Sequence, residues 1–316
     1  MAERAIVTGG AGFIGSHVVD ALLAQGDGVT VVDDLSSGDR GRVAPGAELH
    51  ELDVVDLERL RALAREVRPQ AIYHLAAQAS VVASVENPLR DCDVNVKGTL
   101  SVLEVAREHE APVVFTSTGG ALYGDAAPRP TGEGQIPAPL SPYGSSKWAA
   151  EAYVKTWSLS HGIPNATMRL GNVYGPRQSP HGEAGVVAIF THHLYTNRAP
   201  KLYGHGKPTR DYVYVADVVD ALLRARGRAG TFNVATATET DVATIWRELS
   251  QAAGKTIEPQ LEDLRPGELQ HSCLDAGLAE RELGWRARTS MSEGLGLTYK
   301  ALIEEFEARG ERVGAG

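Results

Sequence analysis

The sequence predicts an α/β protein built on a doubly wound parallel sheet, with helices covering both faces of the sheet. The first observation behind this prediction is that short β-rich runs alternate with longer amphipathic runs through the first half of the chain. Such alternation favours parallel strands joined by right-handed helical crossovers. The second is a glycine-rich turn between the first strand-like run and the first helical run. Beyond about residue 170, proline- and glycine-rich stretches at 175–185 and 199–208 separate shorter elements, so we expect a smaller second lobe there.

Six β-rich runs are the predicted strands, and four amphipathic runs are the predicted helices that lie between them. The strands are Ala5–Thr8, Val29–Asp33, Glu48–Leu52, Ala71–Leu75, Val113–Ser117 and Ala166–Leu170. The helices are Phe13–Ala24, Leu57–Val67, Pro88–Glu108 and Ser145–His161. Two later runs, Asp211–Val215 and Thr231–Val234, also have strand character and could return to the main sheet. We therefore expect one domain over residues 1–168, rejoined by about 211–236, and an interleaved lobe over 169–316.

Composition excludes several classes of protein. The chain has 316 residues, of which 43% are apolar and 22% charged, which suits a folded protein with a substantial core. The formal net charge is −9 and the basic residues are scattered, which opposes a nucleic-acid-binding surface. Cys92 and Cys273 lie far apart, so neither a disulfide framework nor a structural zinc site is expected. The histidines lack metal-ligand spacing, and His181, His192 and His193 are interpreted as packing or solvent-facing residues; no metal is expected.

No targeting or membrane segment is expected. The first strand-like run starts within the first few residues and leaves no room for a signal peptide. No uninterrupted apolar run approaches the roughly 18 residues that a membrane-spanning helix needs. A cytoplasmic location is therefore expected, without a membrane partner.

The turn "VTGGAGFIGS" places Gly9, Gly12 and Gly15 after a strand and at the start of a helix. Glycines there allow a tight turn and close approach of a pyrophosphate to the helix N-terminus. The second strand, in "VTVVDD", ends in Asp33 at the distance that a dinucleotide-binding fingerprint requires. Its carboxylate can accept hydrogen bonds from the adenosine ribose and would repel a 2′-phosphate, so NAD is favoured over NADP. Asp53, in "ELDVVD", either reaches the adenine or is the N-cap of the helix that begins at Leu57.

A tyrosine and a lysine four residues apart are the candidate catalytic pair. In "SPYGSSKW", Tyr143 and Lys147 share one face of a helix. A free tyrosine has a pKa of about 10, and a neighbouring ammonium and a positively charged nicotinamide both favour its phenolate. Alternatively, Tyr143 is a helix-start aromatic residue and Lys147 is a solvated lysine paired with Glu151. The upstream segment "TSTGGALYG" ends a predicted strand in hydroxyl groups.

These motifs, together with "HLAAQ" and "NVKGT", resemble those of the extended short-chain dehydrogenase/reductase superfamily over nearly the whole chain. The segments "RLGNVYGPRQSPHGEAGVV", "TRDYVYVADV" and "RPGE" resemble those of the UDP-glucose 4-epimerases within it. The resemblance implies an NAD-binding Rossmann domain, a C-terminal lobe that binds a UDP-sugar, and 4-epimerisation of the sugar. It also implies a homodimer in which Pro88–Glu108 and Ser145–His161 form a four-helix contact.

The resemblance further implies roles for single residues. Tyr143 is the base, Lys147 is its electrostatic partner and a ribose ligand, and Thr118 holds the sugar O4. The segment "TSTGGALYG" is one residue longer than the family's common form, so Ser117 is the alternative to Thr118. Asn95 supports the catalytic helix. The implied cofactor contacts are Gly9, Gly12, Phe13, Ile14, Gly15, Asp33, Asp34, Asp53, Val54, Leu75, Ala76, Ala77, Asn95, Tyr143 and Lys147.

Arginines are the expected ligands of the diphosphate, because their planar forks match phosphate oxygens. Arg210 and Arg265 match the family's diphosphate arginines, whereas Arg177 is a third diphosphate arginine, a rim residue or part of a structural ion pair. Asn172 matches a sugar and diphosphate contact, and Glu268 matches the acid that binds the uridine ribose. The implied substrate contacts are Thr118, Tyr143, Asn172, Arg177, Val187, Arg210, Arg265, Glu268 and Ser272.

Two glycines select the reaction. By the same resemblance, 4,6-dehydratases carry Asp and Glu directly after the threonine of "TSTGGALYG", and UDP-glucuronate decarboxylases keep a Glu in this segment. Gly119 and Gly120 stand there in this chain and cannot transfer a proton. Oxidation at C4 followed by reduction from the opposite face remains, which is 4-epimerisation.

The preferred sugar and the competing functions are less sharply defined. The residue that gates the sugar site in these epimerases corresponds to Ser272, and its small size predicts some activity on UDP-N-acetylglucosamine. UDP-glucuronic acid 4-epimerisation, or another modification of a nucleotide sugar, is the alternative reaction. An NAD-binding regulatory protein is the non-enzymatic alternative, and the intact pair of Tyr143 and Lys147 argues against it.

Overall fold

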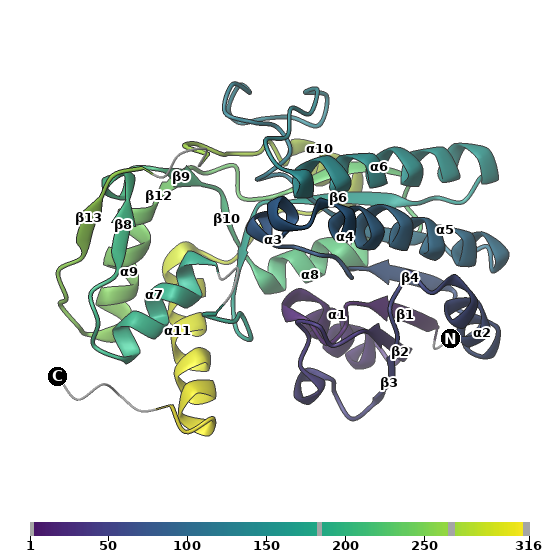
Figure 1. Ribbon diagram of the computed structural model, residues 1–316, viewed down its shortest axis with the longest axis horizontal. Coiled ribbons are helices and arrows are strands. Elements are labelled where there is room, and N and C mark those ends of the chain that lie inside the picture. Colours follow the sequence, from purple (N-terminus) through teal and green to yellow (C-terminus); the bar gives the residue numbers. More distant parts are fainter. Residues whose placement is uncertain (1–2, 182–184, 265–268, 312–316) are drawn as a thin grey trace.

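A seven-stranded parallel sheet forms the larger lobe of the protein (Figure 1). The structure is a computed structural model that describes residues 3–181, 185–264 and 269–311. The strand order is β11-β6-β5-β4-β1-β2-β3, which confirms the predicted doubly wound sheet. The order reverses between β1 and β4, and at such a point the carboxyl ends of the strands form a crevice for a ligand. The strands are β1 Arg4–Thr8, β2 Gly28–Asp33, β3 Ala47–Glu51, β4 Ala71–His74, β5 Val113–Thr118, β6 Ala166–Leu170 and β11 Gly230–Val234.

Helices cover both faces of this sheet and bury two separate cores. On one face, Val18 and Leu22 of α1 pack with Leu222 of α8 against the strands. On the other face, Leu60 of α2 and Val102 of α5 pack with Val154 of α6. The helices of this lobe are α1 Phe13–Ala24, α2 Leu57–Val67, α3 Val81–Glu86, α4 Pro88–Cys92, α5 Gly98–Glu108, α6 Pro142–His161, α8 Val215–Arg224 and α10 Gly277–Leu283.

The long helix predicted over Pro88–Glu108 is interrupted. A π-helical turn, Asp93–Lys97, separates α4 from α5. Such turns are rare and frequently occur at functional sites. Here the turn contains Asn95, whose side chain is buried against α6.

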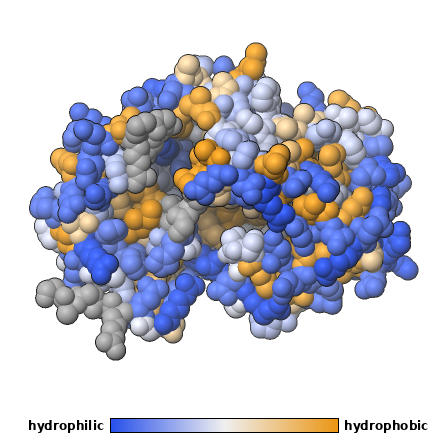
Figure 2. Space-filling model, viewed as in Figure 1, coloured by the Kyte–Doolittle hydropathy of each residue, from blue (hydrophilic) through white to orange (hydrophobic). Residues whose placement is uncertain are grey.

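The smaller lobe contains three helices and three two-stranded sheets among the described residues. Phe190 and Trp246 meet edge to face in its core, with ring centroids 5.3 Å apart. Figure 2 shows a hollow with an apolar floor between the two lobes on the face that is viewed. The helices are α7 Val186–Tyr195, α9 Val242–Ala253 and α11 Met291–Ala308, and the strands are β7 Asn172–Tyr174, β8 Lys201–Tyr203, β9 Thr209–Arg210, β10 Tyr212–Tyr214, β12 Thr240–Asp241 and β13 Gln260–Glu262.

Only one of the two late strands joins the main sheet. β11 pairs with β6 over five residues, from Gly230 opposite Ala166 to Val234 opposite Leu170. The edge beside β6 is therefore occupied, and β10 pairs with β7 in a separate sheet instead. The expectation that Asp211–Val215 returns to the main sheet is wrong. Within the residues that the structure describes, no helix has the length and apolar character needed to span a bilayer.

Candidate active site

The end of β5 and the start of α6 bring the candidate catalytic residues together. Ser141 caps α6 by accepting a hydrogen bond from the Gly144 N–H at 3.2 Å, so the helix begins just before Tyr143. One turn later, Lys147 is 3% exposed. Its Nζ donates a hydrogen bond to the Thr116 carbonyl at 2.9 Å and lies 4.8 Å from the centroid of the Phe115 ring. These contacts fix the ammonium group against the end of β5.

The side chains of Tyr143 and Thr118 interact. Burial raises the pKa of Tyr143 to about 12; the Thr118 hydroxyl lowers it, and the charge of Asp91 raises it further. Burial also lowers the pKa of Lys147 to about 8, against the opposing charges of Asp91 and Glu151. We expected the neighbouring ammonium to favour the phenolate of Tyr143, but the cost of burying that anion is the larger effect here.

Ser117 faces away from this pair. Its hydroxyl donates a hydrogen bond to Glu151 Oε1 at 2.5 Å. Glu151 is ion-paired with Arg169, whose Nη2 lies 2.6 Å from Glu151 Oε2, and both side chains are less than 8% exposed. Arg169 also donates to the Tyr123 hydroxyl at 2.6 Å. Because Glu151 already has this partner and Lys147 is buried, the alternative of a solvated Lys147 paired with Glu151 is wrong.

Asn95 connects the π-helical turn to the start of α6. Its Nδ2 donates to Ser146 Oγ at 3.0 Å, to Asp91 Oδ1 at 3.1 Å and to the Gln78 carbonyl at 3.0 Å. Ser146 Oγ in turn donates to the Tyr143 carbonyl at 3.0 Å. The position of Tyr143 therefore depends on the side chain of Asn95, 48 positions earlier in the sequence.

The glycine-rich turn packs tightly between β4 and α1. Gly9 has φ +71°, and a Cβ atom there would lie 2.6 Å from the Ala76 backbone nitrogen. A Cβ atom on Gly15 would collide with the Gly9 carbonyl. Asp33 is buried at the end of β2, where its carboxylate accepts hydrogen bonds from the Ala11 and Leu35 N–H groups, both at 2.9 Å. Burial raises the pKa of Asp33, and these two hydrogen bonds lower it.

Asp34 and Asp53 share one arginine. Arg90 Nη2 lies 3.0 Å from Asp53 Oδ2 and 3.7 Å from Asp34 Oδ2. The alternative in which Asp53 is the N-cap of α2 is wrong, because Asp56 accepts the hydrogen bond from the Arg59 N–H at 3.1 Å. The other implied cofactor residues lie beside these groups in sequence, with Phe13 and Ile14 in the first turn of α1, Val54 after Asp53, and Leu75, Ala76 and Ala77 after β4.

His74 is fully buried under the site and is neutral. The Thr99 hydroxyl donates to the Asn95 carbonyl at 2.6 Å, so it accepts from the Nε2–H of His74 at 3.0 Å. The Nδ1 of His74 then accepts from the Thr8 hydroxyl at 2.7 Å. Burial lowers the pKa of His74 to about 3, and the charge of Lys147 adds to this effect.

This histidine predicts a loss of stability in acid. In the unfolded chain a histidine of ordinary pKa 6.5 binds a proton at pH 5, whereas folded His74 does not, so proton binding favours unfolding as the pH falls below 6.5. Between pH 7 and pH 5 we expect His74 to contribute about 2 kcal/mol of this loss. Urea unfolding of wild type and His74→Gln at the two pH values measures it. An equal pH dependence in both proteins would contradict the assignment.

The predicted substrate residues of the smaller lobe have different surroundings. Arg177 is ion-paired with Asp20 of α1, with Nη2 2.6 Å from Asp20 Oδ2. The guanidinium of Arg210 donates to the carbonyls of Thr209 and Leu269, at 2.8 and 2.7 Å. The side chain of Val187 is 1% exposed in the core of the lobe, which leaves it no surface for a substrate. Arg265 and Glu268 lie outside the described residues.

The glycines after Thr118 lie near Ser272 and Asn172. Gly119 and Gly120 line a small cavity together with Ser272, which is 9% exposed. A Cβ atom on Gly119 would collide with Leu274 Cδ1, so a larger residue at this position would require the leucine side chain to shift. A Cβ atom on Gly120 would lie 3.3 Å from Asn172 Oδ1, a close contact that a small shift can relieve.

Comparison with known proteins identifies the family. A model of the NAD dependent epimerase/dehydratase family matches residues 5–235. The chain belongs to this family. The UDP-glucose 4-epimerase of Mycolicibacterium smegmatis is 44% identical over 306 residues, which cover 94% of this chain and 97% of that protein. Two crystal structures of UDP-glucose 4-epimerases are similar over 99% of their own chains. That of Thermotoga maritima, with UDP-glucose, is 42% identical over 96% of this chain with a TM-score of 0.94, and that of Thermus thermophilus, with NAD, is 41% identical over 95% of this chain with a TM-score of 0.88.

Membership of the epimerase/dehydratase family confirms the predicted resemblance and makes NAD the cofactor. The residues at the ends of β1 and β2 fit it. α1 has no side-chain N-cap and no acidic residue in its first turn, so its free N–H groups are open to a pyrophosphate. Asp33 uses one lone pair of each carboxylate oxygen for backbone N–H groups, and a carboxylate has about four such positions, so two remain for ribose hydroxyls.

Sequence reasoning did not assign a role in this epimerase/dehydratase site to Asp91, Glu151 or Arg169. All three are buried. The charges of Asp91 and Glu151 raise the pKa of Lys147, and Arg169 is the ion-pair partner of Glu151. Two signals were available in the sequence. Arg169 lies in an apolar strand, where a buried charge requires a partner, and Glu151 follows Lys147 by one helical turn.

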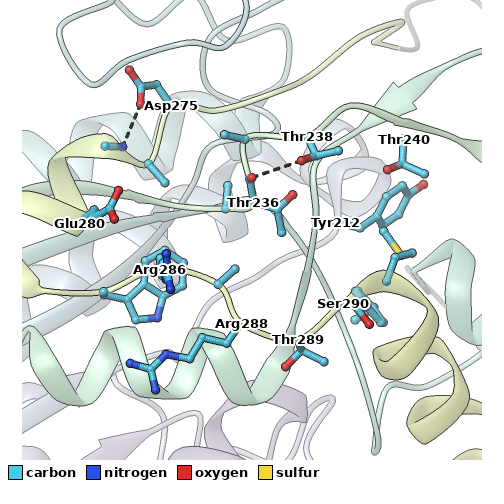
Figure 3. A pocket seen from close by; sticks show the side chains of 18 residues that line it. Tyr212, Thr236, Thr238, Thr240, Asp275, Glu280, Arg286, Arg288, Thr289 and Ser290 are labelled. Carbon is cyan, nitrogen blue, oxygen red and sulfur yellow. Dashed lines mark hydrogen bonds between the residues drawn. The ribbon is translucent and has the colours of Figure 1, made fainter.

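A larger cavity, of about 610 Å³, lies apart from this site (Figure 3). Its walls include Tyr212 of β10, Thr236 in the loop after β11, and Ser290 at the start of α11. Asp275, also in the wall, accepts a hydrogen bond from the Gly277 N–H at 2.8 Å. Neither Tyr143 nor the glycines after Thr118 contribute to it, so we assign it no part in the chemistry.

Proposed function

We propose that the protein is an NAD-dependent 4-epimerase that interconverts UDP-glucose and UDP-galactose through a transient 4-keto sugar. The observation that carries this proposal is that Thr118 interacts with Tyr143, while the next two residues, Gly119 and Gly120, offer no acid. The UDP-glucose 4-epimerases of Mycolicibacterium smegmatis and Thermotoga maritima, similar over nearly the whole chain, support the same reaction.

The proposed mechanism needs one base and one hydrogen-bond donor from the protein. Thr118 holds the 4-hydroxyl of the sugar, and Tyr143 removes its proton. When bound, NAD accepts the hydride from C4 and returns it, and the positive charge of its oxidised nicotinamide lowers the pKa of Tyr143. The 4-keto sugar rotates in the site to present the opposite face of C4. After its reduction, Tyr143 returns the proton to the 4-oxygen, so no net oxidation occurs. Ser117 is not proposed for this role, because its hydroxyl is bonded to Glu151.

The diphosphate is proposed to bind Arg210, with Arg265 as a second cation and Glu268 on the uridine ribose. The guanidinium of Arg210 donates hydrogen bonds to the backbone carbonyls of Thr209, Leu269 and Gln270. These bonds fix the orientation in which the guanidinium would meet a phosphate. Asn172 is proposed to contact the sugar, since its Oδ1 is close to Gly120. The nucleotide-binding and substrate-binding regions are proposed to divide near residue 168, with β11 belonging to the first.

Other reactions and roles have weaker support. A 4,6-dehydration or a decarboxylation in the manner of the related enzymes needs an acid that Gly119 and Gly120 do not supply. UDP-glucuronic acid stays the alternative substrate, although none of the described residues is assigned to its carboxylate. A purely regulatory NAD-binding protein would not need the contact between Tyr143 and Thr118. The cytoplasmic location stays a prediction from the sequence.

A panel of UDP-sugars tests this proposal. We expect UDP-galactose to be converted to UDP-glucose without net reduction of NAD, as measured with a coupled dehydrogenase. We also expect some 4-epimerisation of UDP-N-acetylglucosamine, because Ser272 leaves space beside the sugar, and loss of that activity alone in Ser272→Tyr. Turnover of UDP-galactose with none on the acetylated sugar would contradict the gate assignment. Inactivity on all UDP-hexoses, with turnover of UDP-glucuronate, would favour the alternative.

A homodimer is proposed through the outer surfaces of α3, α4 and α6. Large apolar side chains are exposed there, which is typical of a protein interface. Val85 and Leu89 are 64% and 79% exposed, and Trp148 and Leu159 of α6 are 42% and 77% exposed. α3 and α4 both contact α6, so these residues belong to neighbouring elements. The proposed dimer would bury this surface against the same surface of a second copy.

A further inference from the structure

Three potential metal ligands, His181, His192 and Glu311, meet in the smaller lobe. One ligand atom of each lies within 4.8 Å of the other two. His192 Nε2 is 3.3 Å from Glu311 Oε2, and the rings of His181 and His192 have centroids 5.4 Å apart. Two imidazoles and one carboxylate are a ligand set that zinc commonly takes. We propose that these three side chains bind a zinc ion, with water as the fourth ligand.

Each of the three ligands makes further contacts that hold it in place. His192 lies on α7, and its ring packs perpendicular to Phe306 of α11, with centroids 5.4 Å apart. Glu311 follows the end of α11, where its N–H donates to the Phe306 carbonyl at 3.0 Å and its carbonyl accepts from the Tyr195 hydroxyl at 2.8 Å. His181 lies in the loop before α7, and its N–H donates to Ser179 Oγ at 3.1 Å. The ligands therefore come from three elements that are already in contact.

The spacing of the ligand atoms is close to that of a tetrahedral site. Ligand atoms about 2.0–2.2 Å from zinc are about 3.4 Å from one another. The pair His192 and Glu311 has this separation already. The exposed ring of His181 must close the remaining distance by rotating, and its exposure leaves it free to do so. The sequence predicts no metal because the histidines lack metal-ligand spacing. Such spacing cannot reveal ligands as far apart in the sequence as positions 181, 192 and 311.

A bound ion would cross-link three segments of the smaller lobe. The loop that carries His181 also carries Arg177, which is ion-paired with Asp20 of the larger lobe. Zinc would join this loop to α7 and to the end of α11. These ligands lie together in the folded state but not in the unfolded state. Zinc binding therefore stabilises the folded state, in proportion to the logarithm of the zinc concentration. This effect does not depend on the proposed epimerase activity.

Titration of the intact protein with zinc chloride tests the proposal. After treatment with EDTA and its removal, isothermal titration calorimetry at pH 7.5 is expected to show one zinc ion per chain. The melting temperature is expected to rise with zinc and to fall again with EDTA. His192→Ala and Glu311→Gln are each expected to weaken binding more than tenfold. His161→Ala, which removes an exposed histidine at the end of α6, is the matched control and should bind as wild type.

Two results would overturn the proposal. One is wild-type protein that binds no zinc, with no change in melting temperature. The other is His192→Ala or Glu311→Gln protein that keeps wild-type affinity, which would place any bound zinc elsewhere. Because loss of the His192 ring also removes a contact with Phe306, circular dichroism of each variant without metal separates misfolding from loss of a ligand. Glu311→Gln keeps the size of the side chain and so decides the matter if His192→Ala does not fold.

Discussion

Phenylalanine in place of Tyr143 is expected to lower kcat for UDP-galactose by at least about 10³-fold while NAD stays bound. The Tyr143 hydroxyl is the group that the proposed mechanism uses to remove and return the proton, and a general base is worth about 10²–10⁴-fold in rate. The same hydroxyl interacts with Thr118, so the variant also loses the pairing that is proposed to orient the sugar O4. The measurements are the coupled assay for UDP-glucose and the NAD content of the purified protein.

Tyr153→Phe is the matched control for this experiment. Tyr153 lies on the same helix, α6, but is exposed, and its ring packs edge to face on Trp157, 6.0 Å between centroids. Removing its hydroxyl should leave both kcat and NAD content near those of wild type. Turnover by Tyr143→Phe within tenfold of wild type would rule out the tyrosine as the base. Loss of NAD in that variant would instead show that its effect lies in cofactor binding.

The sequence predicts best those features that depend on neighbouring residues. The bounds of α1 and α2 agree with the prediction because each follows a local signal, glycines before Phe13 and a capping aspartate before Leu57. The strands of the larger lobe shift by at most one residue at each end, since each is a β-rich run between clear breaks. The interruption at Asp93–Lys97 was not predicted, because the apolar spacing is helical on both sides of the turn.

The sequence leaves two candidates, Ser117 and Thr118, for the hydroxyl that contacts the sugar O4. Strand geometry helps to distinguish them. Side chains alternate between the two faces of a strand, so Thr116 and Thr118 share one face of β5 and Ser117 has the other. In the structure Ser117 faces Glu151 while Thr118 faces Tyr143. Counting from the strand therefore favours Thr118, whatever the extra residue in the following turn does.

Other features depend on contacts between distant segments and could not be predicted from spacing. The ion pair of Arg177 and Asp20 joins residues 157 positions apart, and only the packing of the smaller lobe on α1 brings them together. The same is true of the cluster of His181, His192 and Glu311. In these cases the residue type indicates that the side chain can form an ion pair or bind a metal, but not which residues it meets.

Alanine in place of Glu151 is expected to lower the free energy of unfolding by about 3–5 kcal/mol, the cost of leaving a buried partner charge uncompensated. Arg169 is 6% exposed and would keep only its contacts with the Tyr123 hydroxyl and the Glu133 carbonyl. Ser117 would lose its acceptor as well. Urea unfolding followed by circular dichroism measures the loss.

Ser117→Ala and the double variant Glu151→Leu/Arg169→Met separate the two parts of this effect. Ser117→Ala removes one hydrogen bond to a charged group and should cost about 1.5–3 kcal/mol. The double variant replaces the whole ion pair by apolar side chains of similar size and should be more stable than Glu151→Ala, because no unpaired charge is buried. If Glu151→Ala is as stable as wild type, the pair does not hold α6 against β6.

Glu151 also acts on Lys147 through its charge. It raises the pKa of Lys147, which burial has lowered to about 8, so its removal should lower that pKa further. Lys147 would then lose its proton at a lower pH, and activity should decline on the alkaline side earlier in Glu151→Gln than in wild type. A purely structural role for Glu151 would lower activity at every pH without moving this decline. The pH profile of kcat therefore separates support of the fold from control of the lysine charge.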